Sequence, residues 1–181
     1  AYRDRTAEEI RDIALLRRVD GQWQGPEPVA HDGWHIEACP VNGPSLDVRD
    51  QRVAVAWFNG AENSPRVQIA FARDDGSAFT TPLRVDAGRA LGRVDVVLLD
   101  ADSALVSWVE LSGKDAQVVA RQVYQDGRMG MPETLVRIDP SRLSGFPRMV
   151  RRGDDVLIAW TEGDAKSRHV QATVLPASLF D

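Results

Sequence analysis

Residues 104–110 read ALVSWVE, and the same pattern occurs twice more in the chain, as VAVAWFN at 53–59 and VLIAWTE at 156–162. Each copy is a short apolar run with a small residue before the tryptophan and a polar residue soon after it. Seven residues rich in valine and tryptophan favour a β-strand over a helix. The tryptophans are 51 and 52 residues apart, and repeats of about 40–50 residues with several strands each are typical of propeller blades. The sequence therefore predicts a β-propeller.

A second strand is predicted after each tryptophan strand. The segments 66–72 and 117–124 are apolar at β spacing and end at Asp-Gly, a hairpin turn signal. Five or six residues after the turn glycine comes a proline: Pro26, Pro82 or Pro132. Proline lacks the N–H that a central strand needs, so the segment that follows the turn is expected to be an edge strand.

The predicted unit has four antiparallel strands, because another strand follows a glycine-bearing loop at 43–48, 92–99 and 145–150. A helix over residues 6–18 competes with a strand there, and the repeat favours the strand. We expect one all-β domain over 1–181, a portion of a propeller in repeat units of roughly 1–38, 39–88, 89–140 and 141–175. These units amount to about three blades, half of a six-bladed ring. Since an open arc exposes its strand edges, the remaining blades are expected from the same polypeptide, a second copy or another chain.

Composition excludes several classes of protein. The net charge is −5, and the 20 arginines are scattered among 27 acidic residues, which argues against a general nucleic-acid binder. No apolar run approaches about 18 residues, so no membrane span is predicted. The chain begins at Ala1 without methionine, which indicates a processed start, and its one cysteine, Cys39, cannot form an internal disulfide.

The turn at residues 72–79, ARDDGSAF, carries a family resemblance. It resembles the Asp-box of BNR repeats, Ser/Thr-x-Asp-x-Gly-x-x-Trp/Phe: Asp74, Gly76 and Phe79 are in register, and Ala72 replaces the hydroxyl residue. The turns at Asp20-Gly21 and Asp126-Gly127 are degenerate versions. The chain is thus similar to sialidase-like six-bladed propellers. This resemblance implies a carbohydrate or acidic glycan ligand, a glycoside hydrolase activity or a non-catalytic module, and an extracytoplasmic location (periplasmic, secreted or lipoprotein-anchored).

Strand direction locates the candidate site. We call the strand that follows the glycine-bearing loop the first strand of its blade. The start of this strand and the end of the tryptophan strand lie on the same edge of the blade. In propellers this edge belongs to the face around the central channel. The first strands bring Asn42, Arg93, Asp95 and Arg148 to this face, the ends of the tryptophan strands bring Arg3 and Glu110, and the loop over the channel brings Trp34.

Two interpretations of these residues stay open. In the first, Arg93 and Arg148 bind a substrate carboxylate, Asn42, Arg3 and Trp34 complete the binding site, and Asp95 or Glu110 transfers protons. In the second, buried Arg–Asp pairs hold neighbouring blades in register, and the propeller is a non-catalytic protein-interaction or structural module of the bacterial envelope. Sialidases use a tyrosine nucleophile with an acidic partner. Here Tyr124 lies at a hairpin and Tyr2 at a core strand position, so that set is not carried over.

A metal site is weighed at residues 31–35, HDGWH, with Cys39 nearby. The loop lacks helical spacing, so the two imidazoles need not face each other, and the zinc signal is weak. In the alternative interpretation, Trp34 belongs to a long packed loop over the channel mouth, or is exposed and stacks on a sugar ring. No metal and no cofactor is predicted.

Overall fold

The computed structural model describes residues 1–72, 78–163 and 166–180. Their regular structure is β throughout: fourteen strands and three short 3-10 helices, η1 (Ala61–Asn63), η2 (Arg142–Ser144) and η3 (Ala177–Phe180). Over these ranges there is no helix of sufficient length and apolar character to cross a membrane. The predicted all-β class is confirmed.

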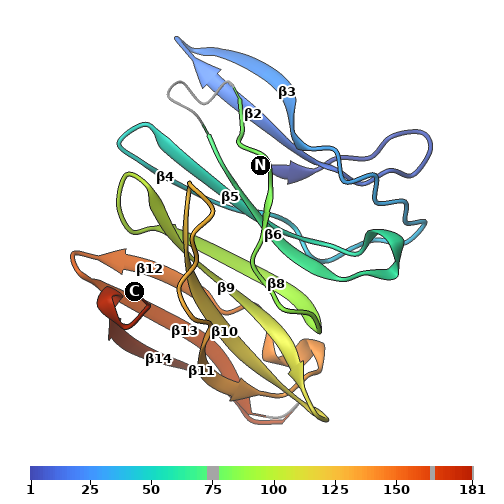
Figure 1. The fold of residues 1–181 in the computed structure, drawn as a ribbon. Helices are drawn as coiled ribbons and strands as arrows, with labels where there is room; N and C mark the ends of the chain where they lie inside the picture. The colour runs from blue at the N-terminus through green and yellow to red at the C-terminus, as the bar shows by residue number, and fades with distance from the viewer. Residues whose placement is uncertain (73–77, 164–165, 181) are drawn as a thin grey trace.

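The strands form four antiparallel sheets, each from a continuous stretch of chain (Figure 1). Sheet 1 contains β1 (Tyr2–Arg3), β2 (Ile13–Val19) and β3 (Gln22–Ala30). Sheet 2 contains β4 (Ser45–Arg49), β5 (Arg52–Asn59), β6 (Arg66–Phe71) and β7 (Leu83–Arg84). Sheet 3 contains β8 (Ala90–Leu98), β9 (Ser103–Ser112), β10 (Asp115–Tyr124) and β11 (Glu133–Ile138). Sheet 4 contains β12 (Arg148–Arg152), β13 (Asp155–Gly163) and β14 (Arg168–Pro176).

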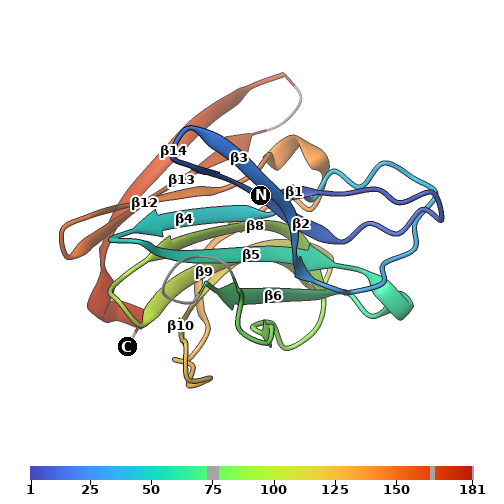
Figure 2. The same cartoon turned by 90° about the horizontal axis from the view of Figure 1, so that it is seen from above.

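The sheets are stacked in chain order, from the blue sheet 1 to the orange and red sheet 4 in Figure 1. Seen from above, sheet 4 is strongly rotated relative to sheets 2 and 3 (Figure 2), as expected for successive blades. Sheets 2 and 3 are the predicted four-stranded blades. The segments that follow the predicted turns, β3, β7 and β11, lie at sheet edges as predicted. Pro26 lies within β3, and Pro82 and Pro132 directly precede β7 and β11. At an edge, the missing N–H of proline costs no hydrogen bond within the sheet.

The segment that could have been a helix is a strand, β2. The Thr6 hydroxyl accepts hydrogen bonds from the backbone N–H groups of Glu8 and Ile10, both at 3.2 Å, but only a single turn forms there. Asp20 and Gly21 then reverse the chain with φ angles of 47° and 80°, which the Asp-Gly pair tolerates. The turn signal and the need to cover sheet 2 outweigh the local helix signal.

The repeated tryptophans occupy equivalent places, each packed against the preceding sheet. Trp57 contacts apolar side chains of sheet 1, Trp108 those of sheet 2 and Trp160 those of sheet 3. Trp57 and Trp108 are fully buried, whereas Trp160 is half-buried. Fully burying a large side chain contributes about 1.5–3 kcal/mol, so the buried Trp57 and Trp108 each stabilise the packing of one blade on the next.

Candidate ligand-binding channel

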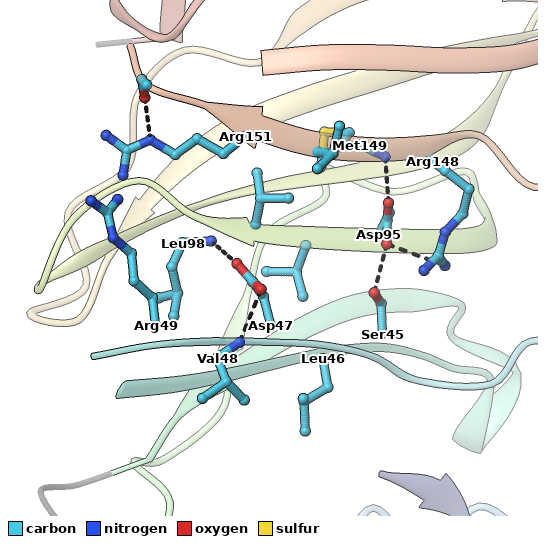
Figure 3. Close-up of a pocket in the computed structure, with 14 residues that line it drawn as sticks. Ser45, Leu46, Asp47, Val48, Arg49, Asp95, Leu98, Arg148, Met149 and Arg151 are labelled. Carbon is cyan, nitrogen blue, oxygen red and sulfur yellow. Dashed lines mark hydrogen bonds and ion pairs between the residues drawn. The ribbon is translucent and has the colours of Figure 1, made fainter. Parts of the chain in front are cut away.

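The first strands of sheets 2, 3 and 4 lie side by side and line one cavity. Strand β8 contacts β4 on one side and β12 on the other, as Figure 3 shows. The cavity between them has a volume of 440 Å³ and is lined by residues 45–49, 95–98, 148–151 and 153. We call this cavity the channel. Of the residues predicted for the channel face, Asp95 and Arg148 line it, and its volume suits a small ligand.

One layer of the channel is polar and comes from equivalent positions in three sheets. Ser45, Asp95 and Arg148 each pair with the residue that precedes a repeated tryptophan. The Ser45 hydroxyl donates to Asp95 Oδ1 at 2.6 Å, and Arg148 Nη1 lies 3.2 Å from the same oxygen. Asp95 is 2% exposed, whereas the Arg148 side chain is 65% exposed. The layer therefore has a sealed carboxylate and an accessible guanidinium.

The channel carboxylates link neighbouring first strands. Asp95 Oδ2 accepts the backbone N–H of Met149 at 2.6 Å, and Asp47 Oδ2 accepts that of Leu98 at 2.7 Å. Asp47 Oδ1 also accepts the N–H of Val48 at 2.9 Å. Hydrogen bonds between a carboxylate and a backbone amide are charge-assisted and strong. Both acids are therefore engaged within the protein, and neither presents a free oxygen pair for proton transfer.

Two further arginines reach the channel from its other end. Arg49 Nη1 donates to the carbonyl oxygen of Leu99 at 3.1 Å, and Arg151 Nη1 donates to the same oxygen. Figure 3 shows their guanidinium groups together at one end of the cavity and Arg148 with Asp95 at the other. The sequence analysis did not identify Arg49 and Arg151 as site residues. Their register on the first strands was the signal that could have identified them.

Arg93 does not line this cavity. It is 8% exposed, and its guanidinium donates to Ser144 Oγ at 2.5 Å and to the carbonyl oxygens of Ser141 at 2.7 Å and Pro140 at 3.3 Å. These contacts join sheet 3 to the loop before sheet 4. Arg93 thus links neighbouring blades through a hydroxyl and carbonyl oxygens, whereas the Arg–Asp ion pair of the second interpretation is found between Asp95 and Arg148.

Arg3 and Asn42 form the centre of a second structural cluster. Arg3 donates to the carbonyl oxygens of Asn42 (3.0 and 3.2 Å), Arg11 (2.7 Å) and Phe58 (2.6 Å). The Asn42 amide donates to Leu91 O at 3.1 Å and accepts from Arg93 N at 3.0 Å. Asn42 thus connects sheets 1, 2 and 3.

Close packing accounts for two further residues of this cluster, Gly92 and Trp34. A Cβ at Gly92 would lie 2.5 Å from Asn42 Cγ, so only glycine leaves room for the amide. Trp34 lies under the Arg3 guanidinium, 4.7 Å from its carbon to the ring centre, and packs edge-on against Phe58 at 5.8 Å. Trp34 is 9% exposed, so the interpretation in which an exposed Trp34 stacks on a sugar is wrong. Packing of the loop buries this side chain.

Burial shifts two charged groups near this cluster. Burial lowers the pKa of Arg3 to about 10, although Asp32 and Asp12 oppose the shift. Burial also raises the pKa of Asp32, even though Trp57 Nε1 donates a hydrogen bond to its Oδ2 at 2.6 Å. Arg3 stays charged at neutral pH, and its donors are used for backbone carbonyls.

Glu110 lies outside the channel. Its Oε2 accepts the indole N–H of Trp108 at 2.9 Å, and its Oε1 accepts Gln117 Nε2 at 3.0 Å. The carboxylate therefore satisfies the buried tryptophan of its own sheet. Glu110 and Asp95 therefore do not face the same cavity and cannot act together on one ligand bound there.

The loop at 31–35 has no metal cluster around it. His31 Nδ1 lies 3.9 Å from Asp12 Oδ2, and Cys39 is exposed. Across residues 1–72, 78–163 and 166–180, no three His, Cys, Asp or Glu side chains gather closely enough to hold a metal ion.

The best Asp-box match lies mostly outside the described residues, which exclude Asp74 and Gly76. The flanking residues Ala72 and Phe79 pair as a bridge. In the degenerate copy, the Asp126 carboxylate accepts the Arg128 N–H at 3.0 Å, and Gly127 has φ 94°. This turn is closed by its own carboxylate and glycine.

Comparison with known proteins gives weak similarities. No family model matches the sequence, and no curated protein matches it. A solved Bombyx mori GH32 beta-fructofuranosidase is similar with a TM-score of 0.46 and 10% identity over 75% of this chain and 34% of that chain. An endo-1,4-beta-xylanase from Bacteroides thetaiotaomicron has a TM-score of 0.44 and 11% identity, covering 94% of this chain and 70% of that chain. An alpha-L-arabinofuranosidase from Lactobacillus brevis has a TM-score of 0.45 and 10% identity, covering 88% and 70%.

All three are carbohydrate-active enzymes by name, and this chain spans about a third of the length of the fructofuranosidase. With TM-scores below 0.5, these similarities assign neither a family nor an activity to the chain.

Proposed function

We propose that this chain is part of a β-propeller that binds an acidic carbohydrate, or a similar sugar-like anion, in its channel without hydrolysing it. The observation that carries the proposal is the charge balance of the cavity. Arg49, Arg148 and Arg151 line it, while its carboxylates, Asp47 and Asp95, already accept backbone N–H groups. Arginine binds carboxylates through paired N–H donors, and the exposed Arg148 is the residue that we assign to this contact.

The engagement of the acidic residues supports binding over hydrolysis. Glycoside hydrolysis generally requires two carboxyl groups that flank one glycosidic bond. Asp95 is sealed by Ser45, Met149 and Arg148, and Glu110 lies outside the cavity on Trp108. The extracytoplasmic location implied by the family resemblance belongs to the same proposal.

Calorimetric titration with glucuronate, N-acetylneuraminate and neutral glucose tests the proposal. We expect binding of the acids and not of glucose, and a loss of about tenfold or more in Arg148→Gln, since a charge-assisted hydrogen bond is removed. Arg152→Gln is the matched control, because this neighbouring arginine on β12 is 81% exposed and does not line the cavity. Turnover of a fluorogenic glycoside or sialoside that disappears in Asp95→Asn would contradict a purely binding role.

A second candidate function, a protein-interaction module, is favoured by the outer face of sheet 4. Val150, Val170 and Val174 are 55%, 73% and 47% exposed on this face. Corresponding faces of sheets 2 and 3 are covered by the next sheet. We propose that a further β-sheet of the same kind covers this face, from the same polypeptide, a second copy or another chain. Light scattering of the protein, with Val170→Lys as the variant, tests self-association directly.

A further inference from the structure

Two guanidinium groups meet at the end of the channel opposite Arg148. Arg49 is the last residue of β4 and Arg151 lies near the end of β12, on either side of the end of β8. Both guanidinium groups donate to one neutral acceptor, the carbonyl oxygen of Leu99. The two cations are therefore held close to each other across the same oxygen, as their facing positions in Figure 3 indicate.

Neither guanidinium forms a close, buried ion pair within the described part of the chain. Asp50 Oδ2 lies 3.6 Å from Arg49 Nε, and the Asp50 side chain is 90% exposed, so the ion pair is weakened by solvent. The second bond of Arg151 goes to the carbonyl oxygen of Gly153 at 2.7 Å. Within the described part of the chain, no carboxylate oxygen lies within 4.0 Å of the Arg151 guanidinium.

Two of the nearby acids, Asp47 and Asp100, accept hydrogen bonds from other groups. Asp47 shares the cavity but accepts the N–H groups of Leu98 and Val48. Asp100 accepts the N–H of Asp102 and the hydroxyl of Ser103. Asp100, Asp154 and Asp155 line an adjacent cavity of 390 Å³ that Arg151 also lines, so these three carboxylates lie beside Arg151 but outside the channel.

This end differs from the other arginine sites of the protein. Arg148 faces the carboxylate of Asp95, and the guanidinium of Arg93 is enclosed by Ser144 and loop carbonyls. Arg49 uses one guanidinium nitrogen for Leu99, and its side chain is 46% exposed. A guanidinium has five N–H donors, so the pair retains donors for a ligand in the cavity that both residues line.

We propose that Arg49 and Arg151 bind the phosphate or sulfate group of a ligand in the channel. A dianionic tetrahedral group matches two guanidinium groups in charge and offers acceptors in several directions, whereas one carboxylate is satisfied by a single bidentate arginine. This inference deepens the proposed function, since it rests on the same cavity, and it predicts that the acidic ligand carries a phosphate or sulfate group at the end of the channel away from Arg148.

The test is calorimetric titration of the protein with inorganic phosphate, sulfate and glucose 6-phosphate, at constant ionic strength. We expect all three to bind the wild type, with glucose 6-phosphate tighter than inorganic phosphate if the sugar occupies the channel. The double variant Arg49→Gln/Arg151→Gln should lose about tenfold or more in affinity per guanidinium, and Arg152→Gln should bind like the wild type. The single variant Arg49→Gln serves if the double variant does not fold, because Arg49 is half-exposed.

The outcomes separate this inference from the proposed function. If Arg148→Gln weakens glucuronate but not phosphate, the two ends bind different groups, as proposed. If Arg148→Gln weakens glucuronate binding but Arg49→Gln/Arg151→Gln leaves phosphate binding unchanged, the phosphate site is wrong while the proposed function stands. An absence of phosphate and sulfate binding at millimolar concentration, or an equal loss in Arg152→Gln, would also overturn the site.

Discussion

The inner face of sheet 3 and the equivalent face of sheet 4 have similar sequences and opposite environments. Val97 and Leu105 of sheet 3 are 5% and 0% exposed because sheet 4 packs over them through Met149 and Ile158. The equivalent Val150 of sheet 4 is 55% exposed. Burial at a blade junction is therefore supplied by the next sheet. The apolar pattern of a strand indicates which face packs against a neighbour, but the neighbouring sheet decides whether that face is buried.

Replacing the equivalent tryptophans of sheets 3 and 4 should give the largest difference in stability. Trp108 is fully buried and its indole N–H is bound by Glu110, whereas Trp160 is half-buried and its indole nitrogen has no hydrogen-bond partner among the described residues. We expect Trp108→Ala to lower the free energy of unfolding by about 3–5 kcal/mol, and Trp160→Ala to lower it by clearly less. Urea denaturation of both variants measures the difference, and equal losses would contradict the ranking.

Removing the carboxylate that links two first strands should have the next largest effect. In Asp95→Ala, the backbone N–H of Met149, the Ser45 hydroxyl and Arg148 all lose their acceptor. We expect a loss of about 2–3 kcal/mol in the free energy of unfolding, from buried donors that are left unsatisfied. Asp155→Ala is the matched control, because its contact to Arg152 is exposed and 4.0 Å long. A similar loss in both variants would show that Asp95 does not link the strands.

The same valine-to-alanine change can be made at equivalent positions of sheets 3 and 4, so the difference in stability loss reports burial alone. Val97→Ala removes two methyl groups from a sealed junction and is expected to cost about 2 kcal/mol. Val150→Ala removes the same groups from an exposed face and should cost less than about 0.5 kcal/mol. Thermal unfolding at several protein concentrations distinguishes the cases, because a large, concentration-dependent effect at Val150 would mean that this face is covered in solution.

The smallest expected effect concerns pH. Burial alone would raise the pKa of Asp86, but hydrogen bonds from Arg84 and from the N–H groups of Val67 and Gly88 outweigh it and lower the pKa. A depressed folded pKa adds stability above the unfolded value of about 3.9, and this stability is lost as pH falls through the folded pKa. The free energy of unfolding of the wild type should therefore exceed that of Asp86→Asn by an amount that is constant near pH 6 and shrinks below about pH 4. A difference that grows on acidification would contradict the sign.

The period of the tryptophan strands predicted the blades and the prolines predicted the edge strands, since both depend on patterns within one strand or hairpin. The partners of Arg93 could not be predicted in the same way. Arg93 has φ 54° at an irregular start of β8, and its acceptors are carbonyls of a loop some 50 residues later. The pairing of Arg49 and Arg151 likewise depends on three sheets being assembled, which no local pattern reports.

Because each sheet is formed by a continuous stretch of chain and buries its apolar side chains against the sheets next to it in sequence, local opening should follow a gradient along the molecule. Among the described residues, the apolar clusters place sheets 2 and 3 between two sheets each, whereas the apolar side chains of sheet 1 pack against sheet 2 and those of sheet 4 against sheet 3. In native-state hydrogen exchange, amides of β5 and β9 should report the global unfolding free energy. Amides of β3 and β14 should exchange through smaller openings that leave the central two sheets intact.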